Sequence, residues 1–174
     1  MIENELLSET IELARLELLV LALPQVEPFR SAIGERRERQ ALLVRWHDSQ
    51  GKWGIGECSC RPDPYFNGEF LEGALSLIRH FIFPALPGRG QLRQVVQALN
   101  RIRGWPFTTA AVLEAVLDWR RRRGQPDALD RRPGPRSRRI PVGISLGLFP
   151  DADSAVTRVE EALAAGYRRI KLKV

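Results

Sequence analysis

Residues 140–174 read IPVGISLGLFPDADSAVTRVEEALAAGYRRIKLKV, and this stretch decides the fold of the C-terminal part of the chain. The apolar run 140–148 is typical of a strand. Asp151 or Asp153 can cap the helix that follows. Three apolar residues fall on one face of that helix: Val156, Val159 and Leu163. Because 168–174 is a second strand, the spacing predicts one parallel strand, helix, strand unit.

The second of these strands carries two lysines. Side chains alternate along a strand, which places Arg169, Lys171 and Lys173 together on one face. If that face meets solvent, the two ammonium groups are a hydrated edge, and the lysine pattern alone favours this interpretation. If it points into a barrel, repulsion between the two groups makes one lysine a usable proton acceptor.

The N-terminal part has a different rhythm. Residues 10–23 are interpreted as a first strand that ends at Pro24. The segment that follows, PQVEPFRSAIGERRER (24–39), is interpreted as a polar loop long enough to be functional. Residues 41–47 and 52–58, ALLVRWH and KWGIGEC, are predicted to form a hairpin.

Three helices follow the hairpin. Apolar residues recur at helical spacing over 70–81, from Leu92 to near Gly104, and over 110–123. The segment DALDRRPGPRSRR (127–139) is rich in proline, glycine and charge, and is the best candidate linker. The predicted domains are therefore residues 1–134 and residues 135–174.

Composition excludes several classes of protein. With 44% hydrophobic and 28% charged residues, the chain can bury a core, so disorder and collagen are excluded. No apolar run is long enough to span a membrane, and the acidic start does not read as a secretory signal, so we expect a cytoplasmic location without membrane contact. Cys58 and Cys60 are too close in sequence for an unstrained disulfide and supply at most two metal ligands, which favours structural or incidental cysteines.

The net charge of +6 is concentrated in one segment. Residues 120–139 contain nine arginines against Asp127 and Asp130. A basic cluster can mark a nucleic-acid site, but this one has no aromatic residue to stack on bases, so we expect no nucleic-acid partner. Basic residues in the last turn of a helix also interact favourably with the helix dipole, which explains the arginines at 120–123 without a binding function.

Four segments together resemble a known family. They are EPFRSAIG (27–34), GIGEC (54–58), VGISLG (142–147) and AAGYRRIKLKV (164–174). The combination is similar to the enolase superfamily, to its muconate lactonizing branch, and within it to the o-succinylbenzoate synthase and N-succinylamino acid racemase group. The likeness extends from Glu12 to Val174, and the last two segments at this separation are its most specific part.

The resemblance implies an α+β capping domain, with a three-stranded antiparallel sheet plus helices, followed by the first βαβ unit of a (β/α) TIM-like barrel. Members remove a proton alpha to a carboxylate with the help of a divalent metal, usually Mg²⁺. By this match Lys173 is the catalytic acid/base and Lys171 assists it by attracting the substrate carboxylate. Five further residues match positions that contact substrate: Ser145, Phe29, Arg30, Ser31 and Phe66.

Each carried-over contact has a structural alternative. Ser145 can instead satisfy a backbone group at a strand end, and Phe29 can pin its own loop to the core. Phe66 stands where the family often has a tyrosine, so a hydroxyl contact is missing. In the third helix, Glu114 and Asp118 depart from the register of the family pattern.

The family's acidic metal ligands lie on later barrel strands than the lysine motif, so no metal ligand is assigned in this chain. We therefore expect an N-terminal fragment that is inactive alone and that can form a homo-oligomer or associate with a further chain through its open barrel edge. The leading function is that of an o-succinylbenzoate synthase-like dehydratase of menaquinone biosynthesis, a hydro-lyase acting on a small carboxylate. N-succinylamino acid racemisation is the alternative, and a non-catalytic capping module or decayed gene product is the alternative of another class.

Overall fold

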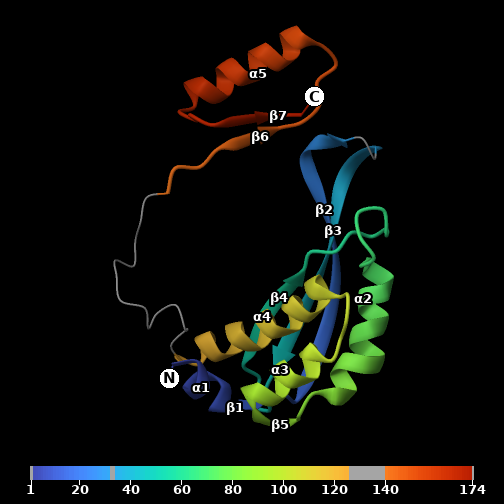
Figure 1. The fold of residues 1–174 in the computed structure, drawn as a ribbon, viewed down its shortest axis with the longest axis vertical. Helices are drawn as coiled ribbons and strands as arrows, with labels where there is room; N and C mark the ends of the chain where they lie inside the picture. The colour runs from blue at the N-terminus through green and yellow to red at the C-terminus, as the bar shows by residue number, and fades with distance from the viewer. Residues whose placement is uncertain (1, 32–33, 126–139, 174) are drawn as a thin grey trace. The chain divides into compact units, whose positions relative to one another are not determined.

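A computed structural model describes residues 2–31, 34–125 and 140–173 (Figure 1). The predicted linker 127–139 lies outside the described residues, and so does the predicted domain boundary between 134 and 135. No helix among the described residues is long and apolar enough to cross a membrane.

The chain forms two compact units, and each contains parts that are distant in the sequence. The first unit comprises 1–23 and 40–133, and the second comprises 24–39 and 134–174. The elements of the structure are, in chain order, α1 (Ile2–Ser8), β1 (Thr10–Glu12), β2 (Arg15–Ser31), β3 (Gly34–His47), β4 (Trp53–Cys58), α2 (Leu71–Leu77), the π-helical turn η1 (Ile78–Ile82), the 3₁₀ turn η2 (Phe83–Ala85), β5 (Arg89–Gln91), α3 (Leu92–Asn100), α4 (Pro106–Arg122), β6 (Ile144–Leu146), α5 (Ala152–Ala164) and β7 (Ile170–Leu172).

The segment expected to be a polar loop is mostly strand. β2 continues through Pro24 and Pro28 to Ser31, and β3 begins at Gly34, so the expectation of a loop over 24–39 was wrong. The strand order β2-β3-β4 places β2 at the edge of the sheet. An edge strand tolerates proline because its outer N–H groups need no ladder partner. Pairing with β3 therefore overrides the local composition.

The predicted first strand is divided in two. β1 ends at Glu12 and pairs with β5, which the sequence pattern did not indicate, whereas β2 begins at Arg15. Between them, the N–H of Leu13 donates to the Gly88 carbonyl at 2.7 Å and that of Ala14 donates to the His47 carbonyl at 2.8 Å. The two residues thus face different sheets, which breaks the continuous strand.

The predicted hairpin is confirmed, and one face of it packs against the core. β3 and β4 are antiparallel, with Leu42 opposite Cys58, Val44 opposite Gly56 and Trp46 opposite Gly54. All six are buried, because alternate residues of both strands face the helices. Val44 and Trp46 on β3 stand opposite glycines on β4, which leaves room for α4.

The GIGEC segment has a packing reason for its glycines. A Cβ added at Gly54 would fall well inside 3.0 Å of the Trp119 backbone nitrogen, and one at Gly56 well inside 3.0 Å of the Ala111 carbonyl oxygen. Both of these backbone atoms belong to α4, which lies directly on β4 (Figure 1). Only glycine permits this approach of helix to strand.

The three predicted helices of the first unit are present. The first begins as α2 and continues through η1, while the second and third correspond to α3 and α4. Together with the sheet they enclose one core, whose fully buried large residues include Trp46, Ile11, Leu42, Ile78, Ile82, Leu92, Val95, Val112 and Val116. The two cysteines are free and buried in the same core, which agrees with a structural role.

The arginines at the end of α4 have structural partners. Arg120 is 2% exposed and its Nε lies 2.8 Å from a carboxylate oxygen of Glu9. Arg122 stacks 3.8 Å from the ring centre of Trp53 and pairs with Asp118 at 2.7 Å. Five of the nine arginines of the cluster fall in 131–139, outside the described residues.

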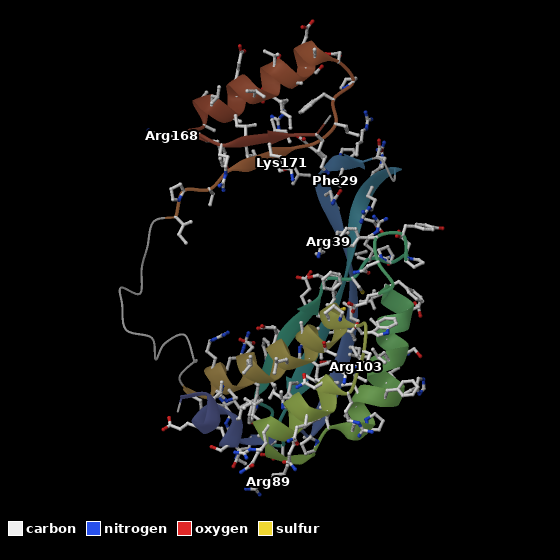
Figure 2. The ribbon with its side chains drawn as sticks, in the orientation of Figure 1. Phe29, Arg39, Arg89, Arg103, Arg168 and Lys171 are labelled. Carbon is white, nitrogen blue, oxygen red and sulfur yellow. The ribbon has the colours of Figure 1, made fainter. Side chains whose placement is uncertain are left out.

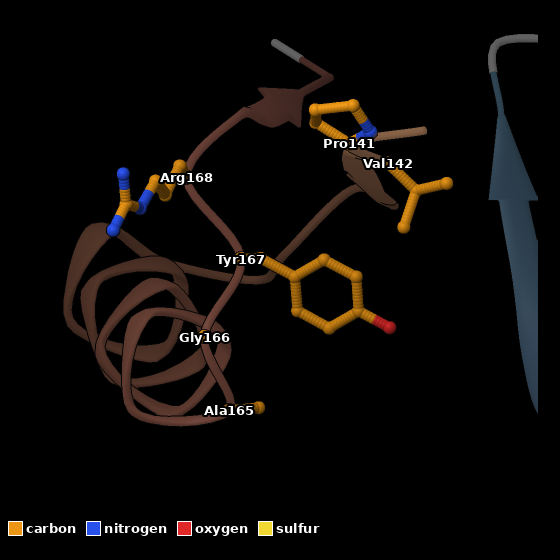
Figure 3. Close-up of a pocket in the computed structure, with 6 residues that line it drawn as sticks. All are labelled: Pro141, Val142, Ala165, Gly166, Tyr167 and Arg168. Atoms are coloured by element: carbon orange, nitrogen blue, oxygen red, sulfur yellow. The ribbon is translucent and has the colours of Figure 1, made fainter. Parts of the chain in front are cut away.

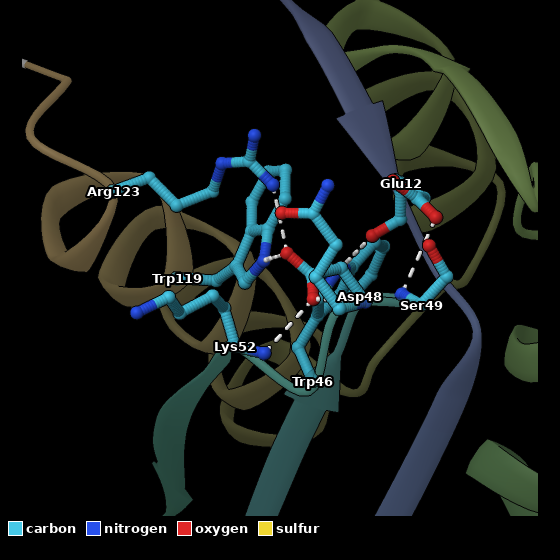
Figure 4. A network of polar contacts seen from close by, with 8 residues as sticks. Glu12, Trp46, Asp48, Ser49, Lys52, Trp119 and Arg123 are labelled. Atoms are coloured by element: carbon cyan, nitrogen blue, oxygen red, sulfur yellow. Dashed lines mark hydrogen bonds and ion pairs between the residues drawn. The ribbon is translucent and has the colours of Figure 1, made fainter.

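Asp48 organises the turn between β3 and β4 and ties it to the end of α4 (Figure 4). One carboxylate oxygen accepts from the backbone N–H groups of Gln50 at 3.0 Å and Lys52 at 2.9 Å. The other accepts from the Trp119 indole at 3.0 Å and the Arg123 guanidinium at 2.7 Å. Burial alone would raise the pKa of Asp48, but these four donors together hold the pKa below its ordinary value of 3.8.

Acid should therefore destabilise this unit through Asp48. A group whose pKa is depressed by folding contributes stability above its unfolded pKa and loses that contribution as the pH falls through the folded value. We expect Asp48→Asn to lower the free energy of unfolding at pH 7 by about 1.5–3 kcal/mol, the range for losing hydrogen bonds to a charged group. Urea unfolding of the wild-type protein and of Asp48→Asn, at pH 7 and again below pH 4, measures the difference between their free energies of unfolding. We expect this difference to be smaller in acid. An equal difference in the free energy of unfolding at both pH values would contradict a pKa of Asp48 that is lowered by folding.

The second unit contains the predicted strand, helix, strand arrangement. β6 and β7 are parallel, with Ser145 opposite Lys171, and α5 connects them. Asp151, rather than Asp153, caps the helix, since its carboxylate accepts from the Ser154 N–H at 2.7 Å. Each strand spans three residues and is shorter than predicted, because only these residues have ladder partners.

Candidate active site

The β6 and β7 pairing places the first two candidate residues side by side. Residues paired across neighbouring strands point to the same face, so Ser145 and Lys171 share a face of this small sheet. Both are exposed. Lys173 lies two residues beyond Lys171, directly after the end of β7, and is half-buried. Ser145 and Lys171 thus lie in the middle of the β6 and β7 ladder, whereas Lys173 follows its C-terminal end, the end that carries chemistry in barrels of parallel strands.

Phe29 is brought to the second lysine. The Lys173 ammonium nitrogen lies 3.9 Å from the centre of the Phe29 ring, which is a cation–π distance. Phe29 is on β2, in the part of the β2 and β3 hairpin that belongs to the second unit, and Figure 2 labels it together with Lys171 on β7. The sequence did not predict this contact with Lys173, and the predicted contact of Phe29 with substrate stays a prediction.

Arg30 is engaged within the hairpin. Its Nε donates to a Glu35 carboxylate oxygen at 2.8 Å, and Arg37 binds the other oxygen at 3.0 Å. The hydrogen bond from Arg30 holds the pKa of Glu35 below its ordinary value, with burial opposing it. Arg30 is therefore held across the hairpin, and its substrate contact stays a prediction. The side chain of Ser31 lies outside the described residues.

Phe66 belongs to the first unit, between β4 and α2, where it is 68% exposed. Its neighbour Tyr65 is exposed as well. An exposed aromatic pair on a connecting segment is available for contact, and the role of Phe66 in substrate binding stays a prediction.

A pocket of about 490 Å³ lies elsewhere in the second unit (Figure 3). Its lining residues precede the two strands: Pro141, Val142, Ala165, Gly166, Tyr167 and Arg168. They occupy the N-terminal ends of β6 and β7, whereas Lys173 follows the C-terminal end of β7. The chemistry of such barrels sits at the C-terminal ends of the strands, so this pocket is not our candidate site.

A Mg²⁺ centre needs several oxygen ligands gathered around one point. In residues 2–31, 34–125 and 140–173, no three His, Cys, Asp or Glu side chains are grouped so that they could hold a metal ion. The described residues therefore do not fit a Mg²⁺ centre, and the chemistry assigned to this chain contains no step through a metal.

The sequence analysis did not identify two residues near the site, Glu27 and Arg158. Arg158 on α5 lies 3.5 Å from the carboxylate of Glu27 on β2 and also pairs with Glu161. The pairing with Glu27 could not be found from local pattern, because an exposed arginine and glutamate so far apart in sequence are indistinguishable from ordinary surface residues.

Known proteins resemble this chain in sequence and fold. No protein-family model matches the sequence. The chain is 30% identical over 166 residues to an N-succinylamino acid racemase from an Amycolatopsis species, covering 94% of this chain and 45% of that protein. A solved enolase-superfamily member from Enterococcus faecalis V583 superposes with a TM-score of 0.78 and 28% identity, covering 95% of this chain and 45% of that one. Over nearly its whole length, this chain is similar to members of the enolase superfamily.

A second relative is a synthase and not a racemase. The o-succinylbenzoate synthase of Bacillus subtilis is 28% identical over 166 residues, covering 94% of this chain and 44% of that enzyme. The chain thus spans less than half the length of the curated relatives that it matches. The predicted fold class is confirmed: an α+β capping domain is followed by a first βαβ unit of an enolase-superfamily barrel.

Proposed function

We propose that this sequence belongs to an o-succinylbenzoate synthase-like enzyme, which removes a proton alpha to a carboxylate and then eliminates water from a cyclohexadiene carboxylate in menaquinone biosynthesis. The observation that carries the proposal is the pairing of Ser145 with Lys171 across the parallel strands β6 and β7, with Lys173 directly after the C-terminal end of β7. The synthase and racemase relatives support the same chemistry.

The roles follow from exposure and position. Lys171 is exposed beside the Ser145 hydroxyl, so its ammonium and that hydroxyl are free to bind a substrate carboxylate. Lys173 is half-buried one residue past the strand, where its amine would take the proton from the carbon next to that carboxylate. The negative charge that develops on the carboxylate would be stabilised in part by Lys171.

Racemisation of N-succinylamino acids is the second candidate, favoured by the Amycolatopsis relative. It begins with the same proton removal, and differs in returning the proton instead of losing a hydroxide. The two are separated by joining residues 1–174 to the part of the Amycolatopsis racemase that lies beyond the matched region, and assaying dehydration and racemisation in parallel. We expect both reactions to be measurable and dehydration to have the larger kcat/KM. Absence of both from a folded chimera would contradict the proposal.

The 174-residue polypeptide by itself should show no turnover. Within its described residues, two parallel strands form the barrel-like part, and no acidic cluster is available for a metal. Loss of a single group that stabilises a developing charge costs about 10²–10³ in rate, and the described residues contain no metal-binding cluster to supply such stabilisation. The measurement is a dehydration and racemisation assay with excess Mg²⁺, with calorimetry for metal binding. Clear turnover or tight stoichiometric Mg²⁺ binding would contradict this expectation and point to association of two chains through the β6 and β7 edges.

A further inference from the structure

The end of the β2 and β3 hairpin, residues 24–39, forms what we call the hairpin tip. It belongs to the same compact unit as β6, α5 and β7. Two contacts attach it to them. One is the Phe29 ring against the Lys173 ammonium at 3.9 Å, and the other is the Glu27 carboxylate with Arg158 of α5 at 3.5 Å.

The two contacts have different chemistry. The Glu27 and Arg158 pair is exposed, with side-chain exposures of 73% and 43%, so it orients the tip but contributes little stability. The face of an aromatic ring attracts a cation within about 6 Å of its centre, and 3.9 Å is well inside that limit. The lysine side chain has four rotatable bonds, so an ammonium held by the ring loses much of its freedom.

One ring can serve only one of the two lysines. Lys171 and Lys173 are two residues apart in extended chain, about 6.5 Å along the strand direction. Lys171 is exposed, whereas Lys173 is half-buried and carries the ring contact. Two features therefore distinguish the ammonium groups: Lys171 lies within β7 and Lys173 directly after it, and only Lys173 has a ring contact among the described residues.

We propose that Phe29 is a positioning residue for Lys173, and that the Glu27 and Arg158 pair holds the tip in the place where the ring reaches the ammonium. This role goes beyond a substrate contact of Phe29. Its catalytic meaning rests on the proposed function, because a fixed Lys173 presents its nitrogen to the carbon beside a carboxylate bound at Lys171. The contact itself can be tested without turnover.

The chain contains three lysines, Lys52, Lys171 and Lys173, which makes competitive acylation a clean probe. Trace labelling with acetic anhydride, followed by cleavage after arginine and fragment-ion mass spectrometry of the peptide 170–174, gives the reactivity of each amine relative to Lys52. In Phe29→Leu, which keeps an apolar side chain without the ring, we expect the Lys173 ratio to rise about two- to fivefold, the population change that corresponds to an exposed cation–π contact. The Lys171 ratio should not change.

Two further variants separate the alternatives. Phe29→Trp keeps a ring face, so its Lys173 ratio should equal that of the wild type. A Lys173 ratio as high as that of Phe29→Leu would mean that the contact does not depend on an aromatic ring, and would overturn the proposal. Arg158→Ala should raise the Lys173 ratio, as Phe29→Leu does. An unchanged ratio would contradict the role of the Glu27 and Arg158 pair in holding the hairpin tip. Phe29→Leu with an unchanged Lys173 ratio, or with an equal rise at Lys171, would overturn the positioning role. Labelling needs no enzymatic activity, so an inactive chimera would count against the proposed function alone.

Discussion

Replacing Lys173 with alanine should reduce the turnover of the chimera with the Amycolatopsis racemase by about 10²–10⁴, the usual contribution of a positioned general base. The lysine amine is the group placed to take the substrate proton, and alanine offers no replacement. Substrate binding should persist, because the exposed Lys171 and Ser145 remain. Steady-state kinetics for kcat, with fluorescence or calorimetric titration for Kd, measure the two effects separately.

Lys171→Ala is the matched control for this variant. It removes a charge that attracts the substrate carboxylate, so we expect a weaker Kd together with a smaller loss of kcat. If Lys173→Ala kept near-normal turnover while Lys171→Ala lost it, the roles of the two lysines would be reversed.

Gly56→Ala should strongly destabilise the first unit. The added methyl group would overlap the Ala111 carbonyl oxygen of α4, and a neighbouring backbone cannot move aside by changing a rotamer. Overpacking of a core costs about 1–3 kcal/mol when side chains can adjust, so we expect about 3 kcal/mol or more at this position. Urea unfolding followed by tryptophan fluorescence measures the change, since Trp46 and Trp119 lie in this core.

Gly68→Ala is the control for the same substitution. No atom lies within 4 Å of a Cβ built at Gly68, so we expect a change within about 0.5 kcal/mol. Equal stability of Gly56→Ala and Gly68→Ala would show that α4 does not rest on β4 as described.

The parts of the fold that depend on local pattern were predictable. The β6, α5 and β7 unit follows from an apolar run, an alternating strand, a cap at Asp151 or Asp153 and the helical spacing between the strands, and the structure selects Asp151. The β3 and β4 hairpin follows from two alternating strands around a turn. The hairpin tip was not predictable from local composition, because Pro24 and Pro28 suggest a loop until the pairing with β3 is known.

The candidate site was predictable only as residue types. Alternation placed Arg169, Lys171 and Lys173 on one face of the last strand, and the family resemblance supplied the roles of the two lysines. The contact that distinguishes Lys173, the ring of Phe29, joins residues far apart in the sequence and depends on the length of β2. The roles of Arg30, Ser31 and Phe66 stay predictions, as does the cytoplasmic location.

Hydrogen exchange at the substrate carbon tests most directly whether Lys173 is the base that removes the proton alpha to a carboxylate. Proton NMR follows this exchange in an N-succinylamino acid incubated in D₂O with the chimera. We expect loss of the alpha-proton signal with the wild-type sequence and retention of that signal with Lys173→Ala. Exchange at the same rate with both proteins would contradict the assignment of Lys173 as the base.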